Sequence, residues 1–312
     1  MKSNRHSFAA PGIAGEIVAK FGRHFLVRVD GNRTLSCILR GRRNDAACGD
    51  HVEVRLAGAA QGVIEAVLPR TSLLYRSDAA HEKLVAANVT QVIIVIGAIP
   101  SFSEELLNRC LIAAENERLS VLIVLNKSDL VEPAMAALVT LELYRNLGYP
   151  VLPLSATASV EPLLPFLNGQ LSVLIGQSGM GKSTIINSLI PSATRATGDI
   201  SSALDAGRHT TTHARLYYLD ERSRIIDSPG VQQFGLHHLD DEEICWAFVE
   251  FRPYIGKCRF NNCRHAGEPD CALAQAAQGK KIEGRRLEFY RKLTTRRQAN
   301  LRQQLPENSS RN

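Results

Sequence analysis

Residues 176–183 read GQSGMGKS, and this stretch constrains the fold more than any other part of the 312-residue chain. It matches the complete pattern G-x-x-x-x-G-K-[ST], with the apolar run LSVLI before it and the helix-forming run STIINSLI after it. In that context backbone N–H groups surround a phosphate, Lys182 neutralises β/γ-phosphate charge and Ser183 binds Mg²⁺. A glycine-rich turn without a ligand is the alternative. The chain is therefore expected to contain a P-loop α/β sheet. The residues expected to contact the phosphates or Mg²⁺ here are Gly176, Gln177, Ser178, Gly179, Met180, Gly181, Lys182, Ser183 and Thr184.

A second motif, NKSD at residues 126–129, follows the apolar run VLIVL and would choose the base. In GTP-binding proteins of this fold, Asn126 would contact the N7 side of the purine, and Lys127 would pack along the base. Asp129 would accept hydrogen bonds from the N1–H and N2–H₂ groups of guanine, a donor pair that adenine lacks. A turn with a helix cap at Asp129 is the alternative. The remaining residues expected at the base are Ser128 and, at the end of the next strand, Ser155 and Ala156.

Two further motifs lie after the phosphate loop. The run IIDSPG places Asp227 in the Mg²⁺ shell and Gly230 at the γ-phosphate, and GRHTTTHARLY offers Thr210 or Thr211 as a Mg²⁺ ligand. A solvated turn is the alternative for each. All five motifs of a GTPase are then present in the order fourth, fifth, first, second, third. We therefore expect a circularly permuted domain, with the original termini joined through SVEPLLPFLNG.

Near the C-terminus the spacing C-RFNN-C-R-H-AGEPD-C brings together three thiols and one imidazole. Four such ligands fill the tetrahedral shell of one structural Zn²⁺ and leave no open position for catalysis. Core cysteines beside a surface histidine are the alternative. The expected zinc ligands are Cys258, Cys263, His265 and Cys271.

The first part of the chain has the pattern of a small β-barrel. Five short runs between residues 13 and 68 carry β-branched residues, and turn signals such as DGN and CGD separate them. Interleaved arginines would suit a nucleic-acid surface, and a solvated basic surface is the alternative. The net charge of +6 is compatible with a polyanionic partner.

These patterns predict a multidomain protein with an OB-like barrel, a central α/β GTPase domain and a mostly helical zinc-binding domain. The expected bounds are a flexible tail at 1–12, the barrel at 13–69, the GTPase domain at 70–235, the zinc domain at 236–300 and a second tail at 301–312. The basic run from residue 280 to 302 is expected to form a helix that contacts RNA phosphates, or else a solvated charged helix.

Cysteine usage and hydropathy indicate the compartment. Seven cysteines, an odd number, follow an N-terminus without a hydrophobic leader, which fits reduced thiols in the cytoplasm. The longest apolar run, around VIIVIGAI, is shorter than the roughly 20 residues that span a bilayer. We therefore expect a cytoplasmic protein without a membrane partner, and a monomer because no dimer seam is apparent.

With these motifs in place, the chain closely resembles the small-ribosomal-subunit-dependent GTPases known as the RsgA (YjeQ) family. The permuted order NKSD, GQSGMGKS, GRHTTT, DSPG and the zinc pattern carry the resemblance. It implies an N-terminal OB domain, a permuted GTPase and a zinc domain. It also implies GTP hydrolysis to GDP on the small subunit and its rRNA during late assembly, coupled to release of the factor.

The position that orients water in ordinary GTPases differs here. Val231 follows the DSPG run where a glutamine is usual, while Gln232 and Gln233 are shifted in register. The resemblance points instead to His209 of GRHTTT as the group that positions water. We therefore expect slow intrinsic turnover that the small subunit stimulates. A non-catalytic RNA-binding scaffold stabilised by GTP and a P-loop kinase or ATPase are the competing functions.

Overall fold

The structure is a computed structural model that describes residues 12–30, 33–41, 45–77, 82–190, 214–228 and 234–304. The chain forms two compact units. The first comprises Met1–Phe102 and Leu119–Phe234, and the second comprises Ser103–Arg118 and Gly235–Asn312. The second unit is thus built from two stretches that lie far apart in the sequence. The finer domain boundaries expected from the sequence stay a prediction.

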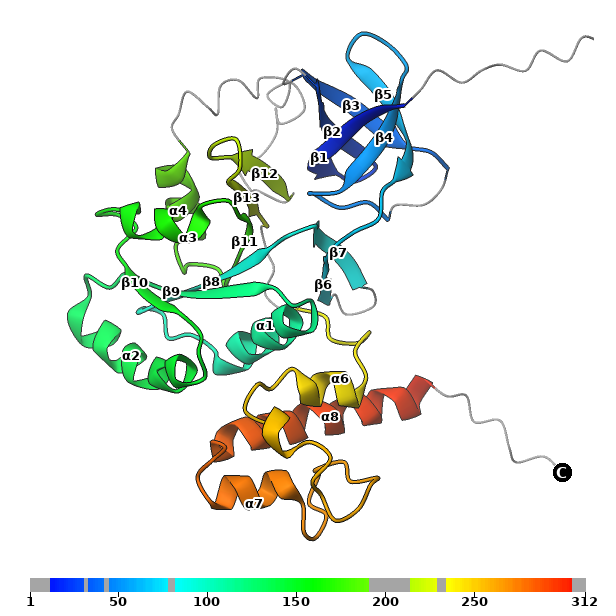
Figure 1. Ribbon diagram of the computed structural model, residues 1–312. Helices are drawn as coiled ribbons and strands as arrows, with labels where there is room; N and C mark the ends of the chain where they lie inside the picture. The colour runs from blue at the N-terminus through cyan, green and yellow to red at the C-terminus, as the bar shows by residue number, and fades with distance from the viewer. Residues whose placement is uncertain are drawn as a thin grey trace, which may run out of the picture. The chain divides into compact units, whose positions relative to one another are not determined.

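The N-terminal part of the first unit is a five-stranded barrel, as the sequence predicted (Figure 1). Neighbouring strands pair in the order β1–β2–β3–β5–β4, and β4 pairs again with β1, which closes the barrel. Ile17, Phe25, Val27, Leu35 and Ile64 lie in its core, each at most 1% exposed. These strands form because alternate β-branched and large apolar residues turn to one face. Their bounds are β1 (Ile13–Phe21), β2 (His24–Val29), β3 (Arg33–Leu39), β4 (His51–Leu56) and β5 (Gln61–Val67).

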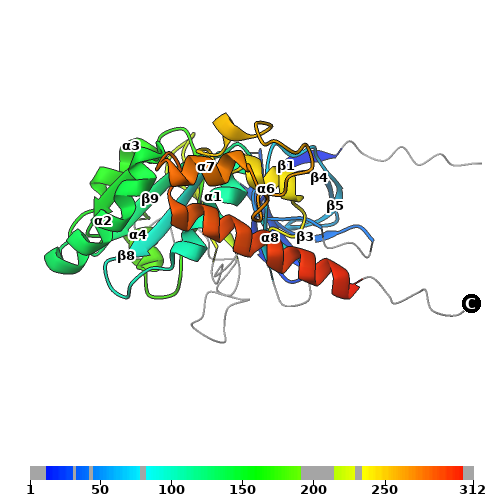
Figure 2. The same ribbon diagram turned by 90° about the horizontal axis from the view of Figure 1, so that it is seen from below.

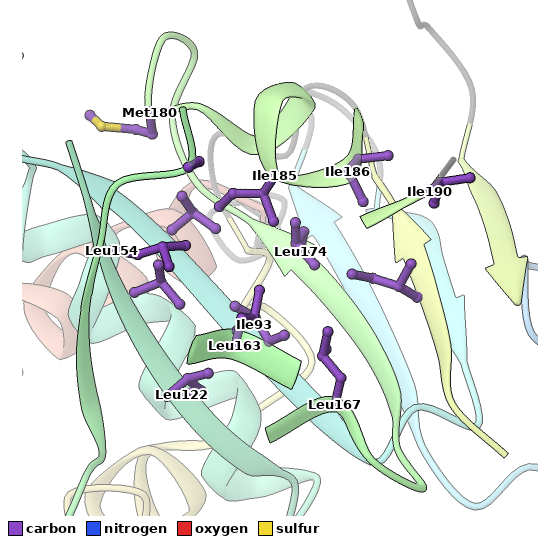
Figure 3. Close-up of a cluster of buried hydrophobic side chains, with 14 residues drawn as sticks. Ile93, Leu122, Leu154, Leu163, Leu167, Leu174, Met180, Ile185, Ile186 and Ile190 are labelled. Carbon is purple, nitrogen blue, oxygen red and sulfur yellow. The ribbon is translucent and has the colours of Figure 1, made fainter. Parts of the chain in front are cut away.

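The rest of the first unit is an α/β sheet with the parallel order β10–β9–β8–β11–β13. Every residue of β8 and β11 is buried, because a parallel strand covered on both faces reads as a continuous apolar run. Figure 3 shows the apolar core between this sheet and its helices. The strands are β8 (Gln91–Gly97), β9 (Ser120–Asn126), β10 (Val151–Leu154), β11 (Leu171–Ile175) and β13 (Arg224–Asp227), and the helices are α2 (Val131–Asn146), the 3-10 helix Glu161–Leu163, α3 (Leu164–Leu167) and α4 (Lys182–Leu189).

Two further features connect the barrel to this sheet. The hairpin of β6 (Leu73–Ser77) and β7 (Glu82–Ala87) follows the barrel in the chain. Strand β12 (Arg215–Tyr218) is antiparallel to β13 and pairs on its other side with β1, where Ala19 lies opposite Arg215. The barrel and the α/β sheet therefore form one 11-stranded sheet, a pairing that the sequence did not predict.

The second unit is mostly helical. Ser103 caps α1 (Glu104–Asn116), and Asp240 and Glu243 form a capping box at α6 (Asp241–Trp246). The 3-10 helix Arg252–Tyr254, α7 (Ala272–Gln278) and α8 (Gly284–Gln304) complete the unit. Helices α7 and α8 contact each other, and α8 is the long helix in Figure 2. Among the described residues, none of the helices is both long and apolar enough to cross a bilayer.

Arg286 of α8 is buried within the second unit. Its side chain is 2% exposed and pairs with Glu250 at 2.6 Å, while its Nη1 donates to Asn108 of α1 at 2.5 Å. Its guanidinium lies 4.6 Å from the ring centroid of Phe248. A buried charge is tolerated only when it is paired and hydrogen-bonded, and these contacts meet that need. They also fix α1 to the C-terminal helices.

Most arginines of α8 whose contacts are described bind other groups of the second unit. The partners are Glu104 for Arg285, Glu250 and Asn108 for Arg286, the carbonyl of His265 for Arg291, Glu105 for Arg296 and Asp241 for Arg297. The basic composition of α8 therefore has a structural cause within the unit. Its expected contact with RNA phosphates stays a prediction.

Candidate nucleotide and metal sites

The phosphate loop connects β11 to α4, as the motif requires. Gly176 has φ of +157°, and a Cβ atom there would lie 2.1 Å from the carbonyl oxygen of Val95. Gly181 has φ of +94°, and its Cβ would lie 2.0 Å from Nδ2 of Asn126. Only glycine fits these two positions. Both have a positive φ that other residues rarely adopt, and in both a Cβ atom would collide with a neighbouring atom. The loop therefore exposes its backbone at the N-terminus of α4, where an anion is favoured.

Lys182 and Asp227 form the charged part of this site. The ammonium group of Lys182 donates to the carbonyl oxygens of Gly176 at 2.6 Å and Gln177 at 2.9 Å. Burial lowers the pKa of Lys182, and the nearby carboxylate of Asp227 opposes that shift. Burial raises the pKa of Asp227, and Lys182 opposes it in turn. Asp227 ends β13 and lies opposite Leu174 of β11, so the parallel register brings it to the phosphate-loop edge of the sheet.

Asn126 connects three of the motifs. It is the last residue of β9 and is 3% exposed. Its Nδ2 donates to the carbonyl of Met180 at 2.9 Å, and its Oδ1 accepts from the backbone N–H of Ala156 at 3.0 Å. One amide thus joins the base motif, the phosphate loop and the SA motif, a role that the sequence did not reveal. Direct contact of Asn126 with the purine stays a prediction.

The other predicted base-binding residues make separate contacts. Lys127 has φ of +63°, and its ammonium donates to the carbonyl of Ile99 at 2.7 Å. The N–H of Ser128 donates to the carbonyl of Leu154 at 3.0 Å. Asp129 is exposed, and the Ser155 hydroxyl lies 3.2 Å from that of Thr157. The structure therefore leaves the Asp129 carboxylate accessible to a ligand.

Met180 anchors the phosphate loop instead of facing solvent. It is 1% exposed and packs into the core drawn in Figure 3. Its sulfur lies 3.0 Å from the backbone nitrogen of Gly97 at the end of β8. Methionine fits such an irregular gap because its side chain is unbranched and polarisable. The apolar residue at this position of the loop was the feature of the sequence that could have predicted its burial.

Several predicted site residues lie outside the described part of the chain. They are His209, Thr210, Thr211 and Gly230, and Val231, Gln232 and Gln233 also lie there. Their predicted roles are therefore not tested by the geometry. Of the remaining phosphate-loop residues, Gly179 has φ of +80°, while Ser183 and Thr184 belong to the first turn of α4.

The predicted metal ligands form a compact cluster in the second unit. The ligand atoms of Cys258, Cys263, His265 and Cys271 all lie within 4.8 Å of one another. The Nδ1 atom of His265 lies 3.5, 3.7 and 3.4 Å from the sulfurs of Cys258, Cys263 and Cys271. Burial lowers the pKa of His265, which favours the neutral imidazole that binds metals. Three sulfurs and one nitrogen at this spacing could hold one zinc ion.

Two groups outside the ligand set shape this metal loop. Arg291 of α8 donates to the carbonyl of His265 at 2.7 Å. The Glu268 carboxylate accepts hydrogen bonds from the N–H groups of Arg264, Ala266 and Gly267. Burial raises the pKa of Glu268, but these bonds outweigh burial and lower it to about 2. A glutamate within the AGEPD segment was the signal for this role in the sequence.

Comparison with known proteins agrees with this geometry. Residues 67–237 match the profile of the RsgA GTPase family. A protein of Nitrosospira multiformis named small ribosomal subunit biogenesis GTPase RsgA is 62% identical over 98% of this chain and 97% of its own. The protein of that name from Nitrosomonas europaea is 52% identical over 90% of each chain.

Two solved structures share the fold. The crystal structure of YjeQ from Thermotoga maritima has a TM-score of 0.70 at 29% identity and covers 92% of this chain and 98% of its own. YloQ, described as a circularly permuted GTPase, has a TM-score of 0.68 at 26% identity and covers 95% of this chain and 98% of its own. The permuted motif order, the closed barrel and these relatives lead to one conclusion: the chain belongs to the RsgA GTPase family, whose members are GTP hydrolases.

Proposed function

We propose that this GTPase binds the small ribosomal subunit and acts in its late maturation, and that turnover of GTP to GDP and phosphate is coupled to release of the protein. The observation that supports this most is the convergence of Asn126, the phosphate loop and Asp227 at one edge of the sheet, in a chain that matches its named relatives over nearly their whole length. The proposal also includes a cytoplasmic location, where the ribosomal partner is found, and a monomeric state.

Each group of the nucleotide site has a proposed role. Backbone N–H groups of residues 176–181 and Lys182 hold the phosphates, with Gly230 at the γ-phosphate. Bound Mg²⁺ would neutralise phosphate charge, held by Ser183, Asp227 and Thr211, with Thr210 as the alternative threonine. His209 positions water. The groups proposed at the base are Asn126, Lys127, Ser128, Asp129, Ser155 and Ala156.

The metal cluster has a structural role in this proposal. Its donor set fits one Zn²⁺ because three thiolates and one imidazole complete a tetrahedral shell. Cys271 also precedes α7 directly, so a bound ion would tie the start of that helix to the loop that contains Cys258. The basic barrel surface and α8 would contact rRNA.

Guanine specificity is expected to depend on Asp129. In Asp129→Asn, GTP should bind about 100-fold more weakly. Asparagine keeps one acceptor oxygen and so loses one of the two hydrogen bonds, and a hydrogen bond to a charged acceptor contributes about 1.5–3 kcal/mol. An asparagine amide can instead donate to the 2-oxo group of xanthine, so affinity for xanthosine triphosphate should rise. Competition between the two nucleotides measures the change.

The matched control for this experiment is Glu132→Gln, which removes a nearby exposed carboxylate on α2. It should leave nucleotide preference as in the wild type. Unchanged preference for GTP in Asp129→Asn would contradict base recognition by this residue.

Turnover is expected to respond to the small subunit. GTP hydrolysis by the purified protein should be slow alone, should rise strongly with small subunits and should not rise with large subunits. High salt should suppress the stimulation, because phosphate contacts release counterions. Tight GTP binding without stimulation by either subunit would contradict the proposed function and favour a GTP-stabilised scaffold.

A further inference from the structure

Glu16 is a buried carboxylate on the outer face of the barrel. It is 8% exposed, whereas its neighbour Ile17 lies in the barrel core. Successive side chains of a strand point to opposite faces, so Glu16 faces away from that core. Its carboxylate accepts hydrogen bonds from the hydroxyl of Tyr218 and, at 2.6 Å, from Nη1 of Arg224. One barrel residue therefore holds a residue of β12 and a residue of β13.

Strand pairing puts four side chains in register here. Arg28 lies opposite Glu16 in the β1–β2 ladder, and Tyr218 lies opposite Arg224 in the β12–β13 ladder. The guanidinium of Arg28 lies 3.6 Å from the ring centroid of Tyr218. We call these four residues the hairpin clasp. Removing one partner of such a buried charged group leaves the others poorly satisfied, so the clasp is expected to act as a unit.

The other end of the same hairpin carries Asp227. There β1 pairs with β12 at Ala19 and Arg215, and Arg215 lies opposite Asp227 in the β12–β13 ladder. A strand rises about 3.3 Å per residue, so the clasp lies roughly 10 Å along the hairpin from Asp227. Strand β1 thus holds β12 at both ends. A slip of one residue in β12 would turn its side chains to the opposite face, and the clasp opposes that slip.

We infer that Glu16 is a positioning residue for GTP hydrolysis, which holds the β12–β13 hairpin so that Asp227 stands at the phosphate loop. The inference rests on the Mg²⁺ role proposed for Asp227 and extends it to the barrel. Glu16 is not among the residues proposed above to contact nucleotide or metal; it acts through Tyr218 and Arg224.

The test is steady-state hydrolysis by the full-length protein with Glu16→Gln. The amide keeps an acceptor for Tyr218 but loses the charge that binds Arg224. We expect kcat to fall about tenfold and the Mg²⁺ concentration for half-maximal turnover to rise about threefold, with the Kd for GDP within about twofold of wild type. A purely structural role would lower the melting temperature and leave the Mg²⁺ dependence unchanged.

Glu65→Gln is the matched control. Glu65 also binds two arginines, Arg40 at 2.6 Å and Arg55 at 2.7 Å, but all three belong to the barrel and its adjoining loop. This variant should hydrolyse GTP like the wild type. Tyr218→Phe is a milder second variant, which removes one hydroxyl and replaces Glu16→Gln if that protein does not fold. It should lower kcat and raise the Mg²⁺ concentration for half-maximal turnover, as expected for Glu16→Gln.

Three outcomes decide the inference. Wild-type kcat and Mg²⁺ dependence in folded Glu16→Gln, or in Tyr218→Phe where that variant replaces it, would overturn it. In Glu16→Gln/Arg224→Met, the fall in kcat should not exceed that of the larger single effect, and fully additive falls would overturn the clasp as a unit. Asp227→Asn reports on the proposed metal role separately. If Asp227→Asn leaves the Mg²⁺ dependence unchanged, the metal role fails and the inference that rests on it is overturned with it. If Asp227→Asn changes the Mg²⁺ dependence and Glu16→Gln behaves like the wild type, the inference alone is overturned.

Discussion

Cys271→Ala is expected to lose the bound metal and to unfold much of the second unit. Cys271 is 1% exposed and precedes α7, so the substitution removes a ligand and frees the start of that helix. Structural zinc sites contribute about 10–16 kcal/mol in small zinc-finger peptides, which is comparable to the whole stability of a domain, about 5–15 kcal/mol. Zinc content of the purified protein and its thermal unfolding followed by circular dichroism measure the effect.

The matched control is Cys110→Ala. Cys110 is fully buried on α1 in the same unit but lies outside the metal cluster. The Cys110→Ala protein should keep a full equivalent of zinc and lose only the packing of a small side chain. Chelation of zinc from the wild type should reproduce the unfolding seen in Cys271→Ala. A Cys271→Ala protein with full zinc and unchanged unfolding would refute the structural site.

Lys182→Ala is expected to reduce kcat/KM for GTP by about 10²–10³-fold, the usual effect of removing one preorganised group that stabilises transition-state charge. The ammonium is held at the phosphate loop by the carbonyls of Gly176 and Gln177. GTP affinity should fall as well, because the same charge attracts the phosphates in the ground state. Single-turnover hydrolysis and nucleotide titration separate the two effects.

Lys281→Ala removes an exposed lysine of the second unit and should leave intrinsic hydrolysis unchanged. Lys182→Arg should not restore activity, because a planar guanidinium differs in shape and hydrogen-bond directions from an ammonium. Hydrolysis by folded Lys182→Ala within about threefold of the wild type would contradict the assignment.

The phosphate loop and the Cys/His cluster were predictable because their chemistry demands a fixed spacing of residues. The run GQSGMGKS between a strand and a helix specifies the phosphate loop, since Gly176 and Gly181 occupy positions that exclude a Cβ atom. The spacing from Cys258 to Cys271 likewise predicted a cluster that the structure brings together. In both cases one ligand imposes the pattern on residues that are close in the sequence.

Features that depend on tertiary contact were not predictable. The bridge from Asn126 to Met180 and Ala156 joins residues from three separate segments. The pairing of β1 with β12 depends on the barrel and the α/β sheet meeting at one edge. The apolar residues of helix α1 repeat as in an ordinary helix that covers a sheet. Its assignment to the second unit comes from tertiary contacts such as that of Asn108 with Arg286. No local pattern in the sequence encodes such partners.

The discontinuity of the second unit has a consequence for biosynthesis. Helix α1 emerges from a translating ribosome long before the 3-10 helix Arg252–Tyr254, whose Arg252 later binds Glu115, and before α8, whose arginines later bind Glu104 and Asn108. Until then α1 lacks the ion pair of Glu104 with Arg285 and the hydrogen bond of Asn108 with Arg286. A polypeptide ending before Gly235 would lack these contacts permanently, because Arg252, Arg285 and Arg286 all lie beyond that residue. Translation must therefore reach α8 before the helix that precedes the base motif has its native surroundings.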